Sequence, residues 1–304
     1  MKRPNINRPR VCTPTQKHRR LLFINRDRRK TIIACALAFL TLLTTTPLAA
    51  CNSSNKENPE KTEIIVFAAS SMTETLTEIS SLYADAAPDV ALIFNFDSSG
   101  TLKTQIQEGA ECDVFISAGQ RQMDQLDKDS SSDVNAEGLD FVLSSARADL
   151  LENRIALVVP PGNPAGIHSF TDMAAALSSG DVLMAMGNSD VPVGQYTQSI
   201  LKYFDLDEQA LAGRGVISYG SNVKEVTVQV SEASVDFGIV YATDAYAAGL
   251  DAIDYASAGM CGRVIYPAAV LKGSQNRETA QAFLEFLQGN EAMAVFERAG
   301  FSRP

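Results

Sequence analysis

The sequence predicts an α/β protein in which mostly parallel sheets are flanked by helices. Apolar runs rich in β-branched residues, such as Ile64-Ile65-Val66-Phe67, alternate with segments whose apolar residues recur every three or four positions. The runs indicate buried strands and the spacing indicates amphipathic helices. Strands that alternate with helices form parallel sheets. The roughly 240 residues from position 63 onward are enough for one large domain or for two lobes of ordinary size.

Eight strands are expected from the apolar runs. Pro160-Pro161 stops one of them, and Pro267 lies inside the last, which indicates an edge or a crossing strand. The expected strands cover residues 63–68, 90–96, 113–117, 154–159, 182–186, 216–219, 236–241 and 263–271.

Nine helices are expected between and after these strands. In the first, Met72, Leu76, Ile79 and Tyr83 fall on one face. Gly300 follows the last helix at a C-cap position. The expected helices cover about residues 72–83, 102–107, 119–128, 169–178, 193–204, 222–232, 243–249, 277–288 and 290–298.

The first 50 residues resemble the signal peptide of a bacterial lipoprotein. Residues 1–30 carry eleven Lys or Arg against one acid, and the uncharged stretch 31–50 follows. Leu48-Ala49-Ala50-Cys51 is similar to a lipobox, which implies cleavage before Cys51 and acylation of that cysteine. The alternative is an uncleaved signal anchor, because twenty uncharged residues can just span a bilayer. Both interpretations keep the basic flank in the cytoplasm and place the rest of the chain outside the membrane.

Residues 51–62 are expected to form a flexible tether. After Cys51 this segment contains Pro59 and otherwise only polar or charged residues. A segment of that composition cannot bury enough apolar surface to fold by itself.

Charge and cysteine content limit the function classes. The formal charge is −10 for the whole chain, and removal of the basic leader takes it to about −20. Such a surface repels nucleic acid and anionic headgroups, so neither is an expected partner. Cys112 and Cys261 either form a disulfide in an oxidising compartment or remain buried free thiols. His168 is the only histidine after position 50, and no cysteine–histidine cluster has zinc-ligand spacing.

Four expected helices begin beside small polar residues or glycine, where backbone N–H groups have no helical partner. Helix N-termini of this kind bind anions readily. Each start taken alone also has a structural interpretation: Ser71-x-x-Glu74 fits a capping box and Asn222-x-x-Glu225 a close variant. The four junctions are residues 69–71, 97–101, 192–194 and 221–223.

Seven segments resemble, in family order, the molybdate-binding proteins of ABC importers. The resemblance covers about residues 62–302. The segments are VFAASS at 66–71, FDSSGTL at 96–102, DVFISA at 113–118, VPVG at 191–194, NVK at 222–224, GIVYATD at 238–244 and YPAAV at 266–270.

The resemblance implies a two-lobed, type II periplasmic-binding-protein-like fold. Each lobe would be a mostly parallel sheet flanked by helices, and two crossing strands near 153–160 and 263–271 would join them. The first lobe would comprise residues 63–152 with 264–304, and the second residues 153–263.

The resemblance also implies an oxyanion site between the lobes. Its hydroxyl donors would be Ser71, Ser99 and Tyr241, and its backbone donors the N–H groups of Val193 and Val223. Molybdate is fully deprotonated at neutral pH, so it presents acceptors only and is satisfied by donors only. Phosphate carries a proton near neutrality and would favour an acidic acceptor, and none of these five residues is acidic.

The implied function is that of an extracytoplasmic, lipid-anchored receptor. It would capture molybdate or tungstate by hinge closure and deliver it to an ABC importer permease, as a monomer with no cofactor. The alternative cargo is sulfate or another small tetrahedral oxyanion. A serine hydrolase is disfavoured because the chain lacks a Gly-x-Ser-x-Gly elbow and His168 would be its only imidazole base.

Overall fold

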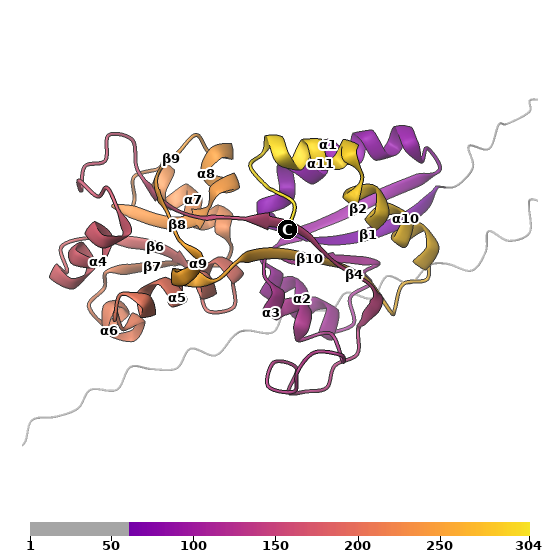
Figure 1. Cartoon of the computed structure of the whole chain (residues 1–304), viewed down its shortest axis with the longest axis horizontal. Helices are drawn as coiled ribbons and strands as arrows, with labels where there is room; N and C mark the ends of the chain where they lie inside the picture. The colour runs from indigo at the N-terminus through magenta and orange to yellow at the C-terminus, as the bar shows by residue number, and fades with distance from the viewer. Residues whose placement is uncertain (1–60) are drawn as a thin grey trace, which may run out of the picture. The chain divides into compact units, whose positions relative to one another are not determined.

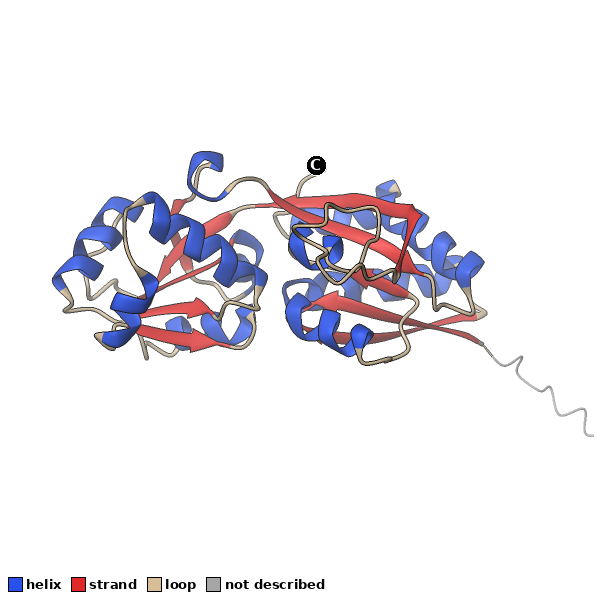
Figure 2. Cartoon of the chain, turned by 90° about the horizontal axis from the view of Figure 1, so that it is seen from below, coloured by secondary structure: helices blue, strands red, loops and turns tan. Residues whose placement is uncertain are grey.

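The computed structural model describes residues 61–304, which form two mixed sheets, each flanked by helices (Figures 1 and 2). The predicted signal peptide, Cys51 and all but the end of the predicted tether lie outside the described residues. Within residues 61–304, none of the helices combines the length and apolar character needed to cross a bilayer.

The first sheet has the strand order β2-β1-β3-β10-β4. Strands β1 (Thr62–Ala69), β2 (Val90–Asp97) and β3 (Val114–Ile116) run parallel to one another. Strand β10 (Val264–Leu271) runs antiparallel to β3 and to β4 (Val142–Asn153). The last strand of the chain therefore lies inside the sheet formed by the first ones.

Both faces of this sheet are covered, which explains the continuous apolar run of β1. Val66 packs in a cluster with residues of α1 (Thr73–Ala86), α10 (Arg277–Gln288) and α11 (Asn290–Arg298). Phe67 points the other way, because successive side chains of a strand face opposite sides. It packs in a second cluster with residues of α2 (Ser99–Gln107) and α3 (Gln120–Asp124). We call this sheet and its helices the first lobe.

The second sheet, with its helices, forms the second lobe and has the strand order β7-β6-β8-β5-β9. Its β6, β7 and β8 are parallel, and β5 runs antiparallel to β8 and β9. The strands are β5 (Ile155–Val159), β6 (Met184–Gly187), β7 (Ile217–Gly220), β8 (Phe237–Tyr241) and β9 (Asp251–Tyr255). The helices are α4 (Phe170–Ser179), α5 (Pro192–Tyr203), α6 (Glu208–Gly213), α7 (Val223–Ser231), α8 (Ala242–Ala247) and α9 (Ala258–Cys261).

Two neighbouring segments carry the chain between the sheets. Strand β4 ends at Asn153 and β5 begins two residues later, while β10 begins at Val264, which pairs with Asn153. Pro267 is in an inner strand, so the expectation of an edge position is wrong and that of a crossing strand is confirmed. The proline is accommodated because the register of β10 against β4 shifts between Tyr266 and Pro267.

The predicted α/β, two-lobed fold class is confirmed, and each sheet combines three parallel strands with two further strands joined by antiparallel pairing. All eight expected strands are present, but β4, β9, α6 and α9 were not expected. Strand β4 contains small and charged residues that lack a period of two, and β9 is a short, half-exposed edge strand.

Candidate ligand-binding site

Ser71 lies in a buried 3-10 turn, η1 (Ser70–Met72), between β1 and α1. The predicted capping box at this serine is wrong, because the N-cap residue of α1 is Met72 and no side chain caps this end of the helix. The Ser71 hydroxyl instead lies 3.0 Å from the hydroxyl of Tyr266 on β10. The Ser71 side chain therefore makes no capping hydrogen bond to α1.

Ser99 is the first residue of α2 and is fully buried. The preceding Ser98 caps this helix by accepting a hydrogen bond from the Thr101 N–H. Ser99 Oγ accepts a hydrogen bond of 2.9 Å from the N–H of Ala118, which follows β3. Because the oxygen acts as acceptor there, the single hydroxyl hydrogen of Ser99 remains available for a ligand.

The two predicted backbone donors lie at the starts of α5 and α7. Val193 is the second residue of α5, after Pro192, and Val223 is the first residue of α7. N–H groups in the first turn of a helix have no intrahelical acceptor. The side chain of Asn222 caps the N–H of Glu225, so the predicted capping variant is confirmed and leaves the Val223 N–H unused by the cap.

Tyr241 ends β8 in the second lobe and is fully buried. Burial, and after it the proximity of Tyr266, raises the pKa of its phenol well above the usual value, so the hydroxyl stays protonated. It donates a hydrogen bond of 3.3 Å to the carbonyl oxygen of Ala118 in the first lobe. Tyr241 therefore spans the two lobes.

Four of the five predicted site residues line one small cavity between the lobes: Ser71, Ser99, Val223 and Tyr241. Val193 is not among the lining residues, although Val191 and Pro192 immediately before it are. The cavity has a volume of about 10 Å³, room for about one water molecule. The other lining residues are Ala69, Ser70, Asp97, Ser98 and Ala118.

Sequence reasoning did not name Asp97, Asn153 or Tyr266 as site residues. Asp97 is a half-buried lining residue whose Oδ1 accepts the N–H of Ser98 at 2.6 Å. Tyr266 and Asn153 contact the site from behind Ser71. The position of Asp97 in the FDSSGTL segment could have drawn attention to it, whereas no sequence signal connects Asn153 with Ser71.

Besides Asp97 in the cavity lining, three charged residues near the site form an ion-paired group. Lys224 on α7 binds Glu74 on α1 at 2.8 Å and lies 3.3 Å from Oδ1 of Asp244 on α8. Asp244 is fully buried, and neither of its oxygens has a hydrogen bond of good geometry. Burial raises the Asp244 pKa to about 6, against the opposing attraction of Lys224. Glu74 and Lys224 link the two lobes by charge, as Tyr241 does by a hydrogen bond.

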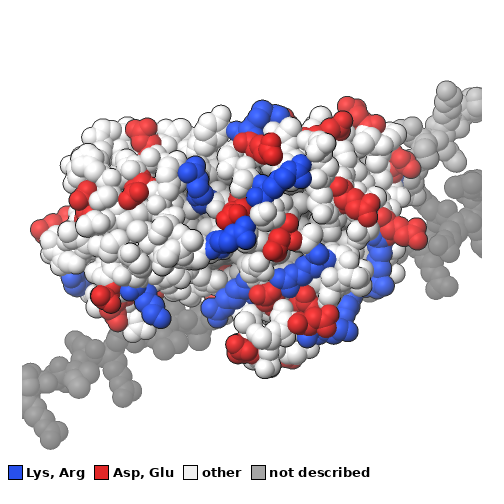
Figure 3. Space-filling view, in the orientation of Figure 1, with Lys and Arg blue, Asp and Glu red and all other residues white. Residues whose placement is uncertain are grey.

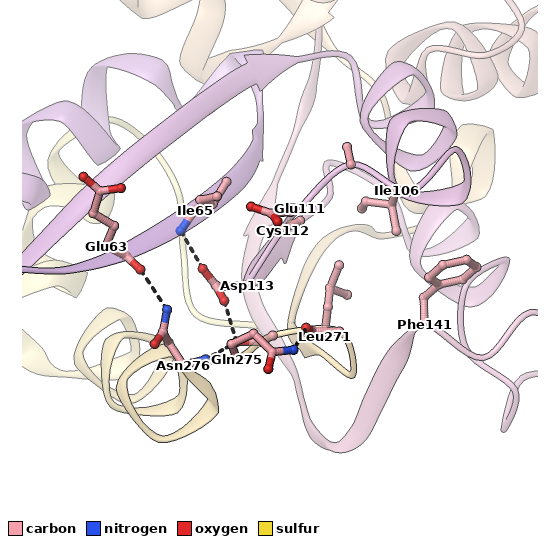
Figure 4. Close-up of a pocket in the computed structure, with 14 residues that line it drawn as sticks. Glu63, Ile65, Ile106, Glu111, Cys112, Asp113, Phe141, Leu271, Gln275 and Asn276 are labelled. Carbon is pink, nitrogen blue, oxygen red and sulfur yellow. Dashed lines mark hydrogen bonds between the residues drawn. The ribbon is translucent and has the colours of Figure 1, made fainter.

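A larger cavity of about 450 Å³ lies elsewhere in the first lobe, near the beginnings of β1 and β3 (Figure 4). Asp113 in this cavity is fully engaged, since it accepts the Ile65 N–H at 2.8 Å and the Ser274 hydroxyl at 2.5 Å. Ligands of α/β sheets bind at the carboxyl ends of the strands, which is the end where Ser71 and Ser99 lie. We therefore assign the larger cavity a structural role.

The remaining predicted candidates lie outside the small cavity. His168 is exposed and does not line it. Cys112 and Cys261 are both free, so the disulfide hypothesis is wrong; of the two free thiols, Cys112 is buried and Cys261 is half-buried. On the face shown in Figure 3, basic and acidic side chains are interspersed and leave no broad basic field. Among residues 61–304 no cluster of three His, Cys, Asp or Glu side chains could hold a metal ion.

Comparison with known proteins agrees with this arrangement. Residues 64–302 match the family described as bacterial extracellular solute-binding proteins. YvgL of Bacillus subtilis, whose name gives it as a candidate ABC transporter substrate-binding lipoprotein, is 31% identical over 89% of this chain and 96% of its own length. The molybdate-binding protein ModA of Escherichia coli is 30% identical over 79% of this chain and 89% of its own.

A solved structure has the same fold. The periplasmic molybdate-binding protein of Azotobacter vinelandii superposes with a TM-score of 0.65 at 21% identity, covering 79% of this chain and 99% of that one. The family match spans nearly all of the described residues. The chain therefore belongs to the bacterial extracellular solute-binding proteins, a family of binding proteins and not of enzymes.

Proposed function

We propose that this protein binds molybdate or tungstate between its two lobes and delivers the anion to the permease of an ABC transporter. The observation that carries the proposal is the convergence of Ser71, Ser99 and Tyr241, from both lobes, with the helix start at Val223 around one small cavity. Val193 would supply a further N–H from the start of α5. The relatives named as molybdate-binding support the choice of ligand.

Neutral donors suit a dianion in a protein of strongly negative charge. Surface charges more than about 8–10 Å away are screened at physiological salt, so local donors decide the affinity. Hydrogen bonds to an ionised acceptor strengthen in a dry cleft. Lys224 is already paired with Glu74 and Asp244, so it adds little free positive charge. The site also avoids the desolvation cost of burying a free Lys or Arg.

Binding is proposed to close the two lobes about the crossing segments near residues 153–160 and 263–271. The lobes would comprise residues 63–152 with 264–304 and residues 153–263. Donors from both sides reach one ligand only when the lobes are together, so the ligand shifts the population toward the closed state. A cavity with room for about one water molecule implies that the donors move slightly apart around a larger anion.

Titration calorimetry with molybdate, tungstate, sulfate and phosphate tests the proposal. We expect molybdate and tungstate to bind tightly. Ser71→Ala, Ser99→Ala and Tyr241→Phe should each weaken binding by about 10- to 150-fold, the effect of removing a hydrogen bond to a charged group. Ser81→Ala, on the exposed face of α1, is the matched control. Tight sulfate or phosphate binding without molybdate binding would overturn the choice of ligand in favour of another tetrahedral oxyanion.

We also propose that acylated Cys51 holds the protein at the membrane. A lipid anchor with a flexible tether over residues 51–62 keeps the receptor at high local concentration beside a permease. The Cys51→Ser variant should move from the membrane fraction to the soluble extracytoplasmic fraction with its molybdate affinity unchanged. A variant that stays in the membrane would indicate an uncleaved signal anchor instead.

A further inference from the structure

We propose that Asn153 and Tyr266 are positioning residues that hold the Ser71 hydroxyl as a hydrogen-bond donor toward the ligand. The inference rests on the proposed oxyanion function and adds two residues that do not line the cavity. It also names the property that they control, which is discrimination between fully deprotonated and protonated anions.

Tyr266 connects Ser71 with the junction of the two lobes. It is fully buried on β10, and its hydroxyl lies 3.0 Å from Ser71 Oγ and 3.2 Å from Asn153 Nδ2. Asn153, 3% exposed, is the last residue of β4, where the chain passes from the first sheet to the second. Its Nδ2 also donates to Thr243 Oγ1 on α8 at 3.0 Å. The amide of Asn153 is thus bonded to both lobes.

The orientation of the Asn153 amide is determined by its other end. Asn153 Oδ1 accepts the Arg154 N–H at 2.8 Å, so Nδ2 is the atom directed at Thr243 and Tyr266. An amide nitrogen can only donate. The Tyr266 oxygen is therefore an acceptor toward Asn153, and its single hydrogen is available for another partner.

The hydrogen of Tyr266 is best placed on Ser71 Oγ. The Tyr266 hydroxyl is hydrogen-bonded to Asn153 Nδ2, which can only donate, and to Ser71 Oγ at 3.0 Å, which can accept. With Tyr266 donating, Ser71 Oγ is an acceptor from behind, and its own hydrogen is free to be donated to a ligand in the small cavity that it lines. The three groups then form a one-way chain of donors from Asn153 through Tyr266 to Ser71.

Such a chain has two consequences for binding. Each hydrogen bond polarises the next, so the last hydroxyl becomes a stronger donor to an anion. The fixed direction also prevents Ser71 from accepting a proton-bearing oxygen, so an anion that still carries a proton meets two opposed hydrogens there. The chain therefore favours molybdate over hydrogen phosphate.

Tyr266→Phe removes the hydroxyl while keeping the ring that packs edge-on against Tyr241 and Phe301, with centroids 5.5 and 5.3 Å away. We expect molybdate to bind about tenfold more weakly, as for loss of support to a charged hydrogen bond. The affinity for phosphate at pH 6, measured by competition, should fall less. Without Tyr266 donating to it, the Ser71 hydroxyl can also accept a hydrogen bond from the protonated oxygen of phosphate. A merely structural defect would weaken both anions equally. Tyr83→Phe, a buried tyrosine in the same lobe, is the control.

A double-mutant cycle separates positioning from direct contact. If Tyr266 acts through Ser71, Tyr266→Phe should cost no further affinity in the Ser71→Ala background. Asn153→Leu, close to isosteric, should reproduce the changed molybdate-to-phosphate ratio even if Tyr266→Phe folds poorly. Additive losses, or an unchanged ratio in a wild-type protein that binds molybdate, would overturn the inference. A wild-type protein that binds no oxyanion would instead overturn the proposed function.

Discussion

Gly100 lies at a close approach of the two lobes beside the candidate site. It is the second residue of α2 in the first lobe and is buried. A Cβ atom added there would lie 2.1 Å from the carbonyl oxygen of Asp190 in the second lobe and 2.9 Å from its carbonyl carbon. Carbon atoms in contact prefer about 3.5–4.0 Å. Gly100→Ala therefore requires the two backbones to separate by roughly 1 Å, and both belong to packed lobes.

The size of the effect follows from the cost of overpacking. Inserting a methyl group into a tight contact typically costs about 1–3 kcal/mol, which is roughly 5- to 150-fold in affinity if only the closed state bears it. Within α2 the substitution has the opposite effect, because alanine in a helix is favoured over glycine by up to about 1 kcal/mol. The variant should therefore bind molybdate more weakly while its melting temperature without ligand stays equal or rises.

Calorimetry and thermal unfolding, each with and without molybdate, measure the two effects separately. The matched control is Gly213→Ala at the end of α6, where an added Cβ meets nothing within 4 Å. The control should keep the molybdate affinity of the wild type. Unchanged affinity in Gly100→Ala would refute the reasoning, since it would mean that the contact with Asp190 is absent from the ligand-bound state.

Three further predictions concern stability and thiol chemistry. Burial raises the Asp244 pKa from 3.8 to about 6, so the folded state holds this proton more tightly than the unfolded chain, and stability is lost as pH rises from about 4 to 6. Measured by urea unfolding, the free energy of unfolding of Asp244→Asn should rise by about 3 kcal/mol relative to that of the wild type between about pH 4 and pH 6. Arg147→Leu removes the guanidinium that lies 2.9 Å from the buried carboxylate of Asp127. The free energy of unfolding, measured with urea at pH 7, should fall by about 3–5 kcal/mol. Cys112 and Cys261 should both be alkylated after unfolding without reductant, as mapped by mass spectrometry, whereas a disulfide between them would block both.

The sequence predicts those strands best that are covered on both faces. Val66 and Phe67 are adjacent yet pack in different clusters, so the run around them is apolar throughout. Strand β4 escapes prediction because its burial depends on pairing with β10, more than a hundred residues later. Its exposed and half-exposed positions carry serine, arginine and aspartate at intervals that fit a helix equally well.

The place of a candidate site residue can be predicted where local sequence determines local geometry. A serine at the start of a helix that follows a strand, as at Ser99, presents its hydroxyl at the carboxyl end of the sheet. The capping prediction failed at Ser71 because a 3-10 turn separates the serine from the helix and lets its hydroxyl reach Tyr266. That contact joins residues 195 positions apart, a separation at which no spacing rule applies.

The contacts that cross between the lobes differ in how they should affect affinity. The pair of half-buried Lys224 with exposed Glu74 lies at the protein surface, where ion pairs contribute about 0–1 kcal/mol, so it can bias closure only slightly. The Tyr241 hydrogen bond to Ala118 is long, at 3.3 Å, and is weak enough to yield its hydrogen to a charged ligand. The steric repulsion between Gly100 and the Asp190 backbone rises steeply as the two approach. The attractive contacts between the lobes are thus weak, so the ligand supplies most of the free energy of closure. The steric repulsion at Gly100 sets how far the lobes can close and therefore how tightly the donors surround the ligand.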